Sequence, residues 1–166
     1  MDKLVSSIEQ KLMPFANKIG TQRHMMAIRK GIVATMPLTI VGSFFTIFLN
    51  FPIPSVAAMI EPYLAILDIP FRYTVGILAL YATFGIASQL AKSYKVDSLT
   101  AGILSVMAFL VTAAPPLRVF DNVEGVIDAG RYINIANLGA ASLFGAIVTA
   151  LISVEIYRIF IEKNIT

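Results

Sequence analysis

The sequence of 166 residues contains no cysteine and no tryptophan, and its only histidine is His24. Without cysteine, the chain forms no disulfide and offers no thiolate to a metal ion or a redox reaction. No carboxylate flanks His24 in the sequence, so a metal site built on this histidine lacks its other ligands. We therefore predict no metal site and no bound cofactor.

Charged residues are also scarce, at 14% of the chain, whereas soluble proteins average about a quarter. No Asp, Glu, Lys or Arg occurs between Gly31 and Ile60. About 20 apolar residues in a helix cross the hydrocarbon core of a bilayer, which is about 30 Å thick. The composition therefore predicts an all-α polytopic membrane protein, because a helix satisfies its own backbone hydrogen bonds in lipid.

The sequence lacks the motifs of catalysis and of nucleic-acid binding. It has no paired catalytic carboxylates, nucleophile elbow, phosphate-binding loop or HExxH motif. No ionisable residue lies at the centre of a predicted span, which argues against a self-contained pump or an intramembrane hydrolase. No basic face with interleaved aromatic residues is present, so we expect no nucleic-acid partner. We predict no catalytic residue in this chain, and its role in any enzyme complex stays open.

Four apolar runs are predicted to cross the membrane as helices. They cover about residues 31–49, 73–91, 99–114 and 138–156. Residues 54–69 are less clear, since they contain prolines and two acidic residues. This segment is consistent with an extracytoplasmic helix, a re-entrant piece or a fifth span.

Outside the spans, the pattern predicts an amphipathic helix and a surface hairpin. Apolar positions at helical spacing in residues 2–13 indicate a helix that either lies in the membrane interface or packs on other protein. We therefore divide the chain into a basic cytoplasmic N-terminal segment, 1–30, and a transmembrane helical domain, 31–166. Residues 118–135 are charged, contain two glycines and are rich in β-formers, which favours a small hairpin.

The distribution of Lys and Arg predicts the orientation. With four spans and a cytoplasmic N-terminus, the outer side holds only Arg72, Arg118 and Arg131. The remaining cations then lie inside, as the positive-inside rule requires. These inner cations are Lys3, Lys11, Lys18, Arg23, Arg29, Lys30, Lys92, Lys95, Arg158 and Lys163. We predict that Arg23, Arg29 and Lys30 hold the start of the first span on the cytoplasmic side.

Small residues recur every four positions in two of the spans. One set is Ala79, Thr83, Ala87 and Ala91, and the other is Ala141, Gly145, Thr149 and Ser153. Small faces allow helices to approach closely in lipid, where the hydrophobic effect does not drive association. We expect these faces to pack within the chain or against a second copy, which makes a homodimer a predicted state.

Three separated segments together identify a family. The segment QRHMMAIRKGIVATMPLTIVGSFF, the preceding KLMPFANKIG and the closing LGAASLFGAIVTALISVEIYRIFIEKNIT resemble enzyme IIC, the membrane permease subunit of the sugar phosphotransferase system, of the lactose/cellobiose class. The resemblance implies a bacterial inner-membrane transporter that takes up a β-linked disaccharide such as cellobiose. It also implies soluble phosphotransferase subunits as partners and no nucleotide or metal on the permease.

The resemblance covers only the N-terminal half of such a permease. In the family, the sugar-binding His and Glu lie in the C-terminal half, so no substrate residue is assigned here, and His24 is not the sugar-site histidine. The resemblance places much of the dimer contact in the half that is present. We therefore expect a scaffold half of a permease, and the alternative is a membrane interaction module that transports nothing by itself.

Overall fold

The computed structural model describes residues 20–113 and 135–163, and this part of the chain is helical and contains no strand. The first helical run is α2 (Arg23–Val33) followed by α3 (Met36–Leu49). The second run, 54–94, joins α4 (Pro54–Ile60), α5 (Leu64–Thr74) and α6 (Leu78–Tyr94) through 3-10 turns at Glu61–Tyr63 and Val75–Ile77. It is followed by α7 (Ser98–Ala113), two further 3-10 turns, Ile135–Asn137 and Ala140–Ser142, and α8 (Leu143–Glu162).

The predicted all-α membrane fold is confirmed. Three helical runs are long and apolar enough to cross a bilayer: Arg23–Leu49, Pro54–Tyr94 and Ala140–Glu162, and α7 is a shorter apolar helix. Large apolar side chains point outward on all of them, for example Ile40 on α3, Val111 on α7 and Phe144 on α8. Outward-facing apolar surface on this scale fits a hydrocarbon environment better than water.

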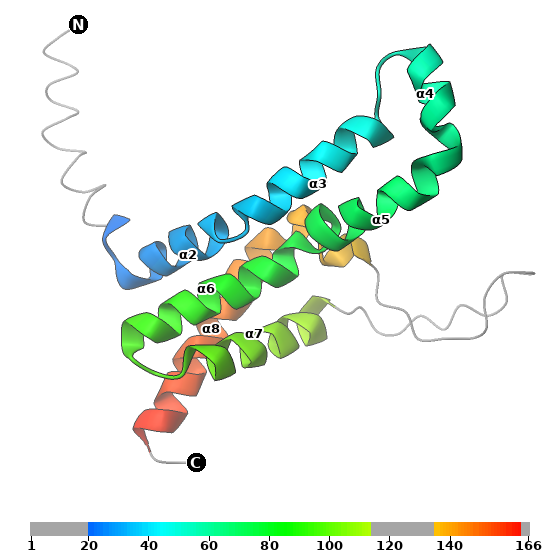
Figure 1. The fold of residues 1–166 in the computed structure, drawn as a ribbon. Coiled ribbons are helices and arrows are strands. Elements are labelled where there is room, and N and C mark those ends of the chain that lie inside the picture. The colour runs from blue at the N-terminus through cyan, green and yellow to red at the C-terminus, as the bar shows by residue number, and fades with distance from the viewer. Residues whose placement is uncertain (1–19, 114–134, 164–166) are drawn as a thin grey trace, which may run out of the picture.

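The structure settles how residues 54–69 join the second predicted span. Residues 54–69 form α4 and the first half of α5, so they begin the same 41-residue run that contains the second predicted span. No reversal of the chain separates them from α6, so they do not form a separate span. At about 1.5 Å per residue the run is about 60 Å long, which exceeds the thickness of a hydrocarbon core. Its N-terminal part pairs with α3 as an arm that extends from the bundle, with α4 at the tip (Figure 1).

Pro37 explains the break between α2 and α3. It occupies one of the first two positions of α3 and has no N–H to donate to the preceding turn. The backbone tightens there, with the Thr35 N–H bonded to the Ile32 carbonyl, and the Thr35 hydroxyl donates to the same oxygen at 2.8 Å. The helical run that contains the predicted first span starts earlier, at Arg23, and the last residues of the predicted 1–30 segment belong to α2. The division of the chain at residue 30 stays a prediction.

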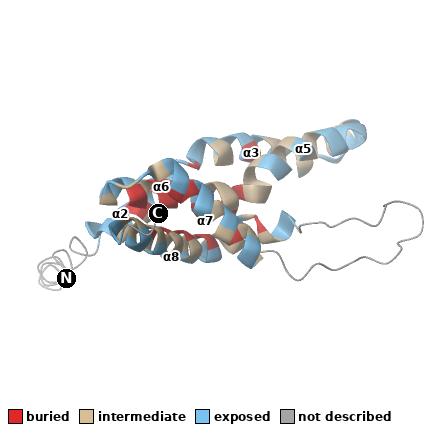
Figure 2. Ribbon diagram, turned by 90° about the horizontal axis from the view of Figure 1, so that it is seen from below, coloured by how far each residue is buried: buried red, intermediate tan, exposed pale blue. Residues whose placement is uncertain are grey.

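Helix α6 is the centre of a bundle in which α2, α7 and α8 pack around it (Figure 2). Its small residues Ala79, Thr83, Ala87 and Ala91 have no exposed surface, so this face packs within the chain. The buried hydroxyl of Thr83 donates to the Ala79 carbonyl at 2.7 Å. In the described part of the chain, no buried side-chain nitrogen or oxygen lacks a hydrogen-bond partner, which an apolar environment requires.

On α8, the inward face is one position away from the predicted one. Ala146, Ala150 and Val154 are fully buried against the bundle, whereas Gly145 is exposed and nothing lies within 4 Å of the position its Cβ would take. The four-residue repeat therefore has two neighbouring registers, and only the tertiary packing selects between them. The predicted helix 2–13 and the predicted hairpin 118–135, up to its last residue, lie outside the described residues.

Candidate functional site

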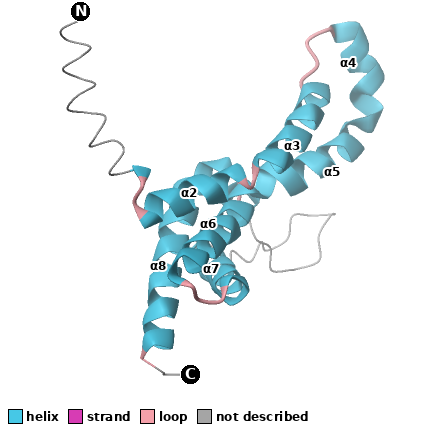
Figure 3. Cartoon of the chain, turned by 60° about the vertical axis from the view of Figure 1, so that its left-hand side comes forward, coloured by secondary structure: helices cyan, strands magenta, loops and turns pink. Residues whose placement is uncertain are grey.

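The start of α2, the end of α6 and the C-terminal half of α8 lie together at one end of the bundle, and the last turns of α8 extend beyond it (Figure 3). This end carries the cations that the sequence places on one side of the membrane, except those outside the described residues. They are Arg23, Arg29, Lys30, Lys92, Lys95, Arg158 and Lys163. Arg72, predicted to lie on the opposite side, is on α5 in the arm and pairs with Asp68 one turn earlier. The described cations predicted to be cytoplasmic therefore lie at one end of the bundle, and Arg72, predicted to be on the other side of the membrane, lies away from them.

A cluster of polar side chains joins three helices at this end, and we refer to His24, Tyr94, Glu155 and Arg158 as the polar cluster. Nε2 of His24 lies 2.8 Å from Oε1 of Glu155, although 131 positions separate the two residues. The Tyr94 hydroxyl donates to the same carboxylate oxygen. Nη1 of Arg158 lies 3.5 Å from Oε2 of Glu155, three positions earlier, and its Nε lies 2.7 Å from Oε1 of Glu162.

Two guanidinium groups lie close to the ring of Tyr94. The Cζ atom of Arg23 is 4.7 Å from the ring centroid and that of Arg158 is 4.5 Å away. Cations at this distance are attracted to the face of an aromatic ring. The ring and the carboxylate thus hold together α2, α6 and α8, and the cluster acts as a connection between helices.

The sequence reasoning missed this cluster, because it considered only carboxylates next to His24 along the chain. No local signal marks Glu155 as its partner. The pair still falls short of a metal site: the described residues contain no group of three His, Cys, Asp or Glu side chains that is able to hold a metal ion. The absence of a metal site in the rest of the chain stays a prediction.

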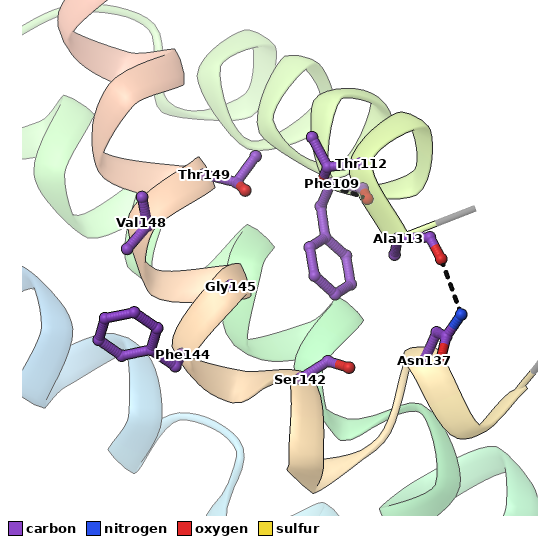
Figure 4. Close-up of a pocket in the computed structure, with 9 residues that line it drawn as sticks. All are labelled: Phe109, Thr112, Ala113, Asn137, Ser142, Phe144, Gly145, Val148 and Thr149. Carbon is purple, nitrogen blue, oxygen red and sulfur yellow. Dashed lines mark hydrogen bonds between the residues drawn. The ribbon is translucent and has the colours of Figure 1, made fainter. Parts of the chain in front are cut away.

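A second feature is an open groove of about 540 Å³ between α7 and α8. Figure 4 shows its lining side chains: Phe109, Thr112, Ala113, Asn137, Ser142, Phe144, Gly145, Val148 and Thr149. The polar groups are few and neutral, and the amide nitrogen of Asn137 already donates to the Ala113 carbonyl at 3.0 Å. Sugar recognition uses a few convergent polar or charged groups in a largely apolar pocket, and among the described residues no carboxylate lines this groove to accept a hydrogen bond from a sugar hydroxyl.

The fold, the outward apolar surface and the charged end define a helical integral membrane protein. The family model "Phosphotransferase system, EIIC" matches residues 29–166. The chain therefore belongs to the EIIC family of the phosphotransferase system, as its resemblance predicts.

Relatives agree with this assignment along the whole chain. The "Lichenan permease IIC component" of Bacillus subtilis (strain 168) is 41% identical over 173 residues, which cover 99% of this chain and 38% of that protein. The "PTS system cellobiose-specific EIIC component" of Geobacillus stearothermophilus is 42% identical over 173 residues, with the same coverage. The chain thus spans 38% of the length of these relatives.

A solved structure also resembles this one. It is the crystal structure of the transporter ChbC, the IIC component from the N,N'-diacetylchitobiose-specific phosphotransferase system. The TM-score is 0.81 at 38% sequence identity, and the match covers 95% of this chain and 38% of that one. The arm and bundle are thus parts of a transporter fold.

Proposed function

We propose that the chain is the N-terminal scaffold part of a phosphotransferase-system permease that takes up a β-linked disaccharide such as cellobiose. The observation that carries the proposal is the 42% identity to a cellobiose-specific EIIC component over 99% of the chain. The likeness to a permease for a second disaccharide, diacetylchitobiose, supports the same substrate class. The remaining length of the relatives offers room for a sugar site that the described groove does not provide.

The proposed partners follow from the same relationship. A permease of this system delivers its sugar for phosphorylation, so soluble subunits of the system are the expected partners on the cytoplasmic side. In this proposal, the chain needs no cofactor of its own to serve as part of the permease. Any sugar bound by the assembly is contacted in part by residues beyond the 38% of the relatives that this chain matches.

We further propose a location in the bacterial inner membrane with the N-terminus in the cytoplasm. The described cations that gather at one end of the bundle support this orientation, because Lys and Arg flanking spans are retained in the cytoplasm. Reporter fusions at Thr166 and within 118–135 test it, and the first should report a cytoplasmic and the second an extracytoplasmic position. Neutralising Arg23, Arg29 and Lys30 together should weaken the orientation, since each cation near an anionic surface contributes about 1 kcal/mol.

Self-association is a separate part of the proposal. The groove beside Gly145 is open on an apolar helix face, and small residues there allow a second backbone to approach. The buried face of α6 is not a candidate for this contact. The same observation favours the alternative function, a membrane interaction module that transports nothing by itself.

An exchange experiment tests the function. In the cellobiose-specific EIIC component of Geobacillus stearothermophilus, the matching segment is replaced by this chain, and phosphoenolpyruvate-dependent uptake of labelled cellobiose is measured. We expect uptake by the chimera and none by membranes that contain the 166 residues alone. The matched control is the unaltered permease at the same level of membrane insertion. A well-inserted chimera without uptake would contradict the permease assignment, and uptake by the chain alone would contradict the scaffold role.

A further inference from the structure

A second groove, of about 590 Å³, lies between α2 and α6 at the cationic end of the bundle. Helix α2 contributes Arg23, Met26 and Lys30 to its lining, and helix α6 contributes Gln89, Lys92 and Ser93. We call this the cationic groove. It is distinct from the polar cluster, with which it shares no residue, although Arg23 stacks on the ring of Tyr94.

No acidic side chain of residues 20–113 or 135–163 balances the charge of Lys30 and Lys92 in the cationic groove. Lys30 and Lys92 form no ion pair with any residue in the described ranges, whereas Arg158 at the same end binds two carboxylates. Among the described residues, no Asp or Glu lines the groove, and its neutral polar side chains, Gln89 and Ser93, are hydrogen-bonding groups. Cations from two helices therefore face one concave surface to which the described part of the chain contributes no anion.

The cationic groove continues into an apolar track. An adjoining depression of about 430 Å³ is lined by Met26, Arg29, Lys30, Val33 and Gln89. Beyond it the outer face of the same helical run is apolar and exposed, with Val33 at 47%, Met36 at 53% and Ile40 at 71%. A ligand that fits both features has an anionic head and an apolar tail.

We propose that the cationic groove binds the phosphate headgroup of an anionic phospholipid through Lys30 and Lys92. One acyl chain of this lipid packs along the exposed apolar face of α2 and α3. Basic pockets between transmembrane helices bind anionic lipid headgroups because their cations attract the headgroup charge. The geometry distinguishes this site from general attraction to the membrane surface, because it requires Lys92 of α6 as well as the cations of α2. The site does not depend on sugar transport.

Native mass spectrometry of the purified, delipidated full chain in detergent tests the proposal, with phosphatidylglycerol and phosphatidylcholine as probes. We expect tighter binding of phosphatidylglycerol. Lys30→Gln or Lys92→Gln alone should weaken it about fivefold, and the double variant about 30-fold. Phosphatidylcholine binding should not change. The double variant Lys30→Arg with Lys92→Arg keeps both positive charges and should retain the affinity for phosphatidylglycerol.

The matched control is Lys95→Gln with Lys163→Gln, which removes the same charge from the same end of the bundle but from outside the groove. This control should leave phosphatidylglycerol binding unchanged, and an equal loss would overturn the proposal. Inorganic phosphate at the same concentration should not displace the lipid, and displacement would mean a general phosphate site. Equal affinity for both lipids would overturn the lipid assignment and favour an acidic protein surface as the occupant. The single variants keep the test decisive if the double variant does not fold.

Discussion

At Gly31, α2 lies in close contact with α6, so Gly31→Ala should push the two helices apart. A Cβ at this position would lie 2.5 Å from the Cα and backbone nitrogen of Ile86. These atoms belong to the most buried helix of the bundle, and they have no freedom to rotate away. Restoring ordinary van der Waals contact requires a relative shift of the two helices of about 1 Å.

The cost of this substitution combines two opposing effects. Overpacking of a close contact costs about 1–3 kcal/mol, and replacing a helical glycine with alanine returns up to about 1 kcal/mol. We therefore expect Gly31→Ala to lower the free energy of unfolding by about 1–2 kcal/mol. The effect should act at the α2–α6 contact, because Gly31 is buried and the three atoms nearest to the added Cβ all belong to Ile86 of α6.

Unfolding in mixed detergent micelles, followed by far-ultraviolet circular dichroism, measures this difference without the need for a cysteine or tryptophan probe. The matched control is Gly145→Ala on α8, where nothing lies within 4 Å of the added methyl group. This control should be neutral or slightly stabilising. Equal stability of the Gly31→Ala protein and the wild type, or equal destabilisation by both substitutions, would refute the close-contact reasoning.

Three further predictions concern association, the polar cluster and the cap of α7. Gly145→Leu should reduce self-association, measured by crosslinking, with little loss of stability, because the site is open. Ala87→Leu should instead unfold the bundle, since Ala87 is fully buried. Loss of crosslinking with Ala87→Leu but not with Gly145→Leu, in folded protein, would place the dimer contact on α6. Glu155→Ala should lower the free energy of unfolding in the same assay by only about 1 kcal/mol, because the partner side chains of Glu155 are a third or more exposed and solvent screens the ion pairs. An unchanged free energy of unfolding would mean that the polar cluster does not stabilise the contact between the helices. The pKa of Asp97 is lowered by hydrogen bonds from Thr100, whose N–H donates to the carboxylate at 2.8 Å. The stability it contributes is therefore present above its unfolded pKa and lost as the pH falls through the folded value, and Asp97→Asn, which still caps the helix, should remove this acid dependence.

The class of the protein and the existence of its main helices follow from the sequence alone. Long runs without charge have few other structural solutions than membrane helices, so each of the segments 31–49, 73–91, 99–114 and 138–156 overlaps a helix. The ends agree less well, since the first helical run begins at Arg23 and α8 continues to Glu162. The separation of cations to one end followed from the same runs, because the position of a charge relative to a span depends only on local sequence. The family motifs are linear features too, and the family assignment was therefore correct from the sequence alone.

Which helix faces pack against one another cannot be read from the sequence and depends on the three-dimensional arrangement of the helices. The contact between His24 and Glu155 joins residues 131 positions apart, and no local pattern encodes which of the acidic residues the histidine meets. The joining of 54–69 to α6 also depends on packing, since α5 pairs with α3 as an arm, and prolines alone allow either a turn or a continued helix. The same holds for small residues: a four-residue repeat fixes a face on a helix, but whether that face meets a neighbour, as at Ala87, or an open groove, as at Gly145, is set by where the other helices lie.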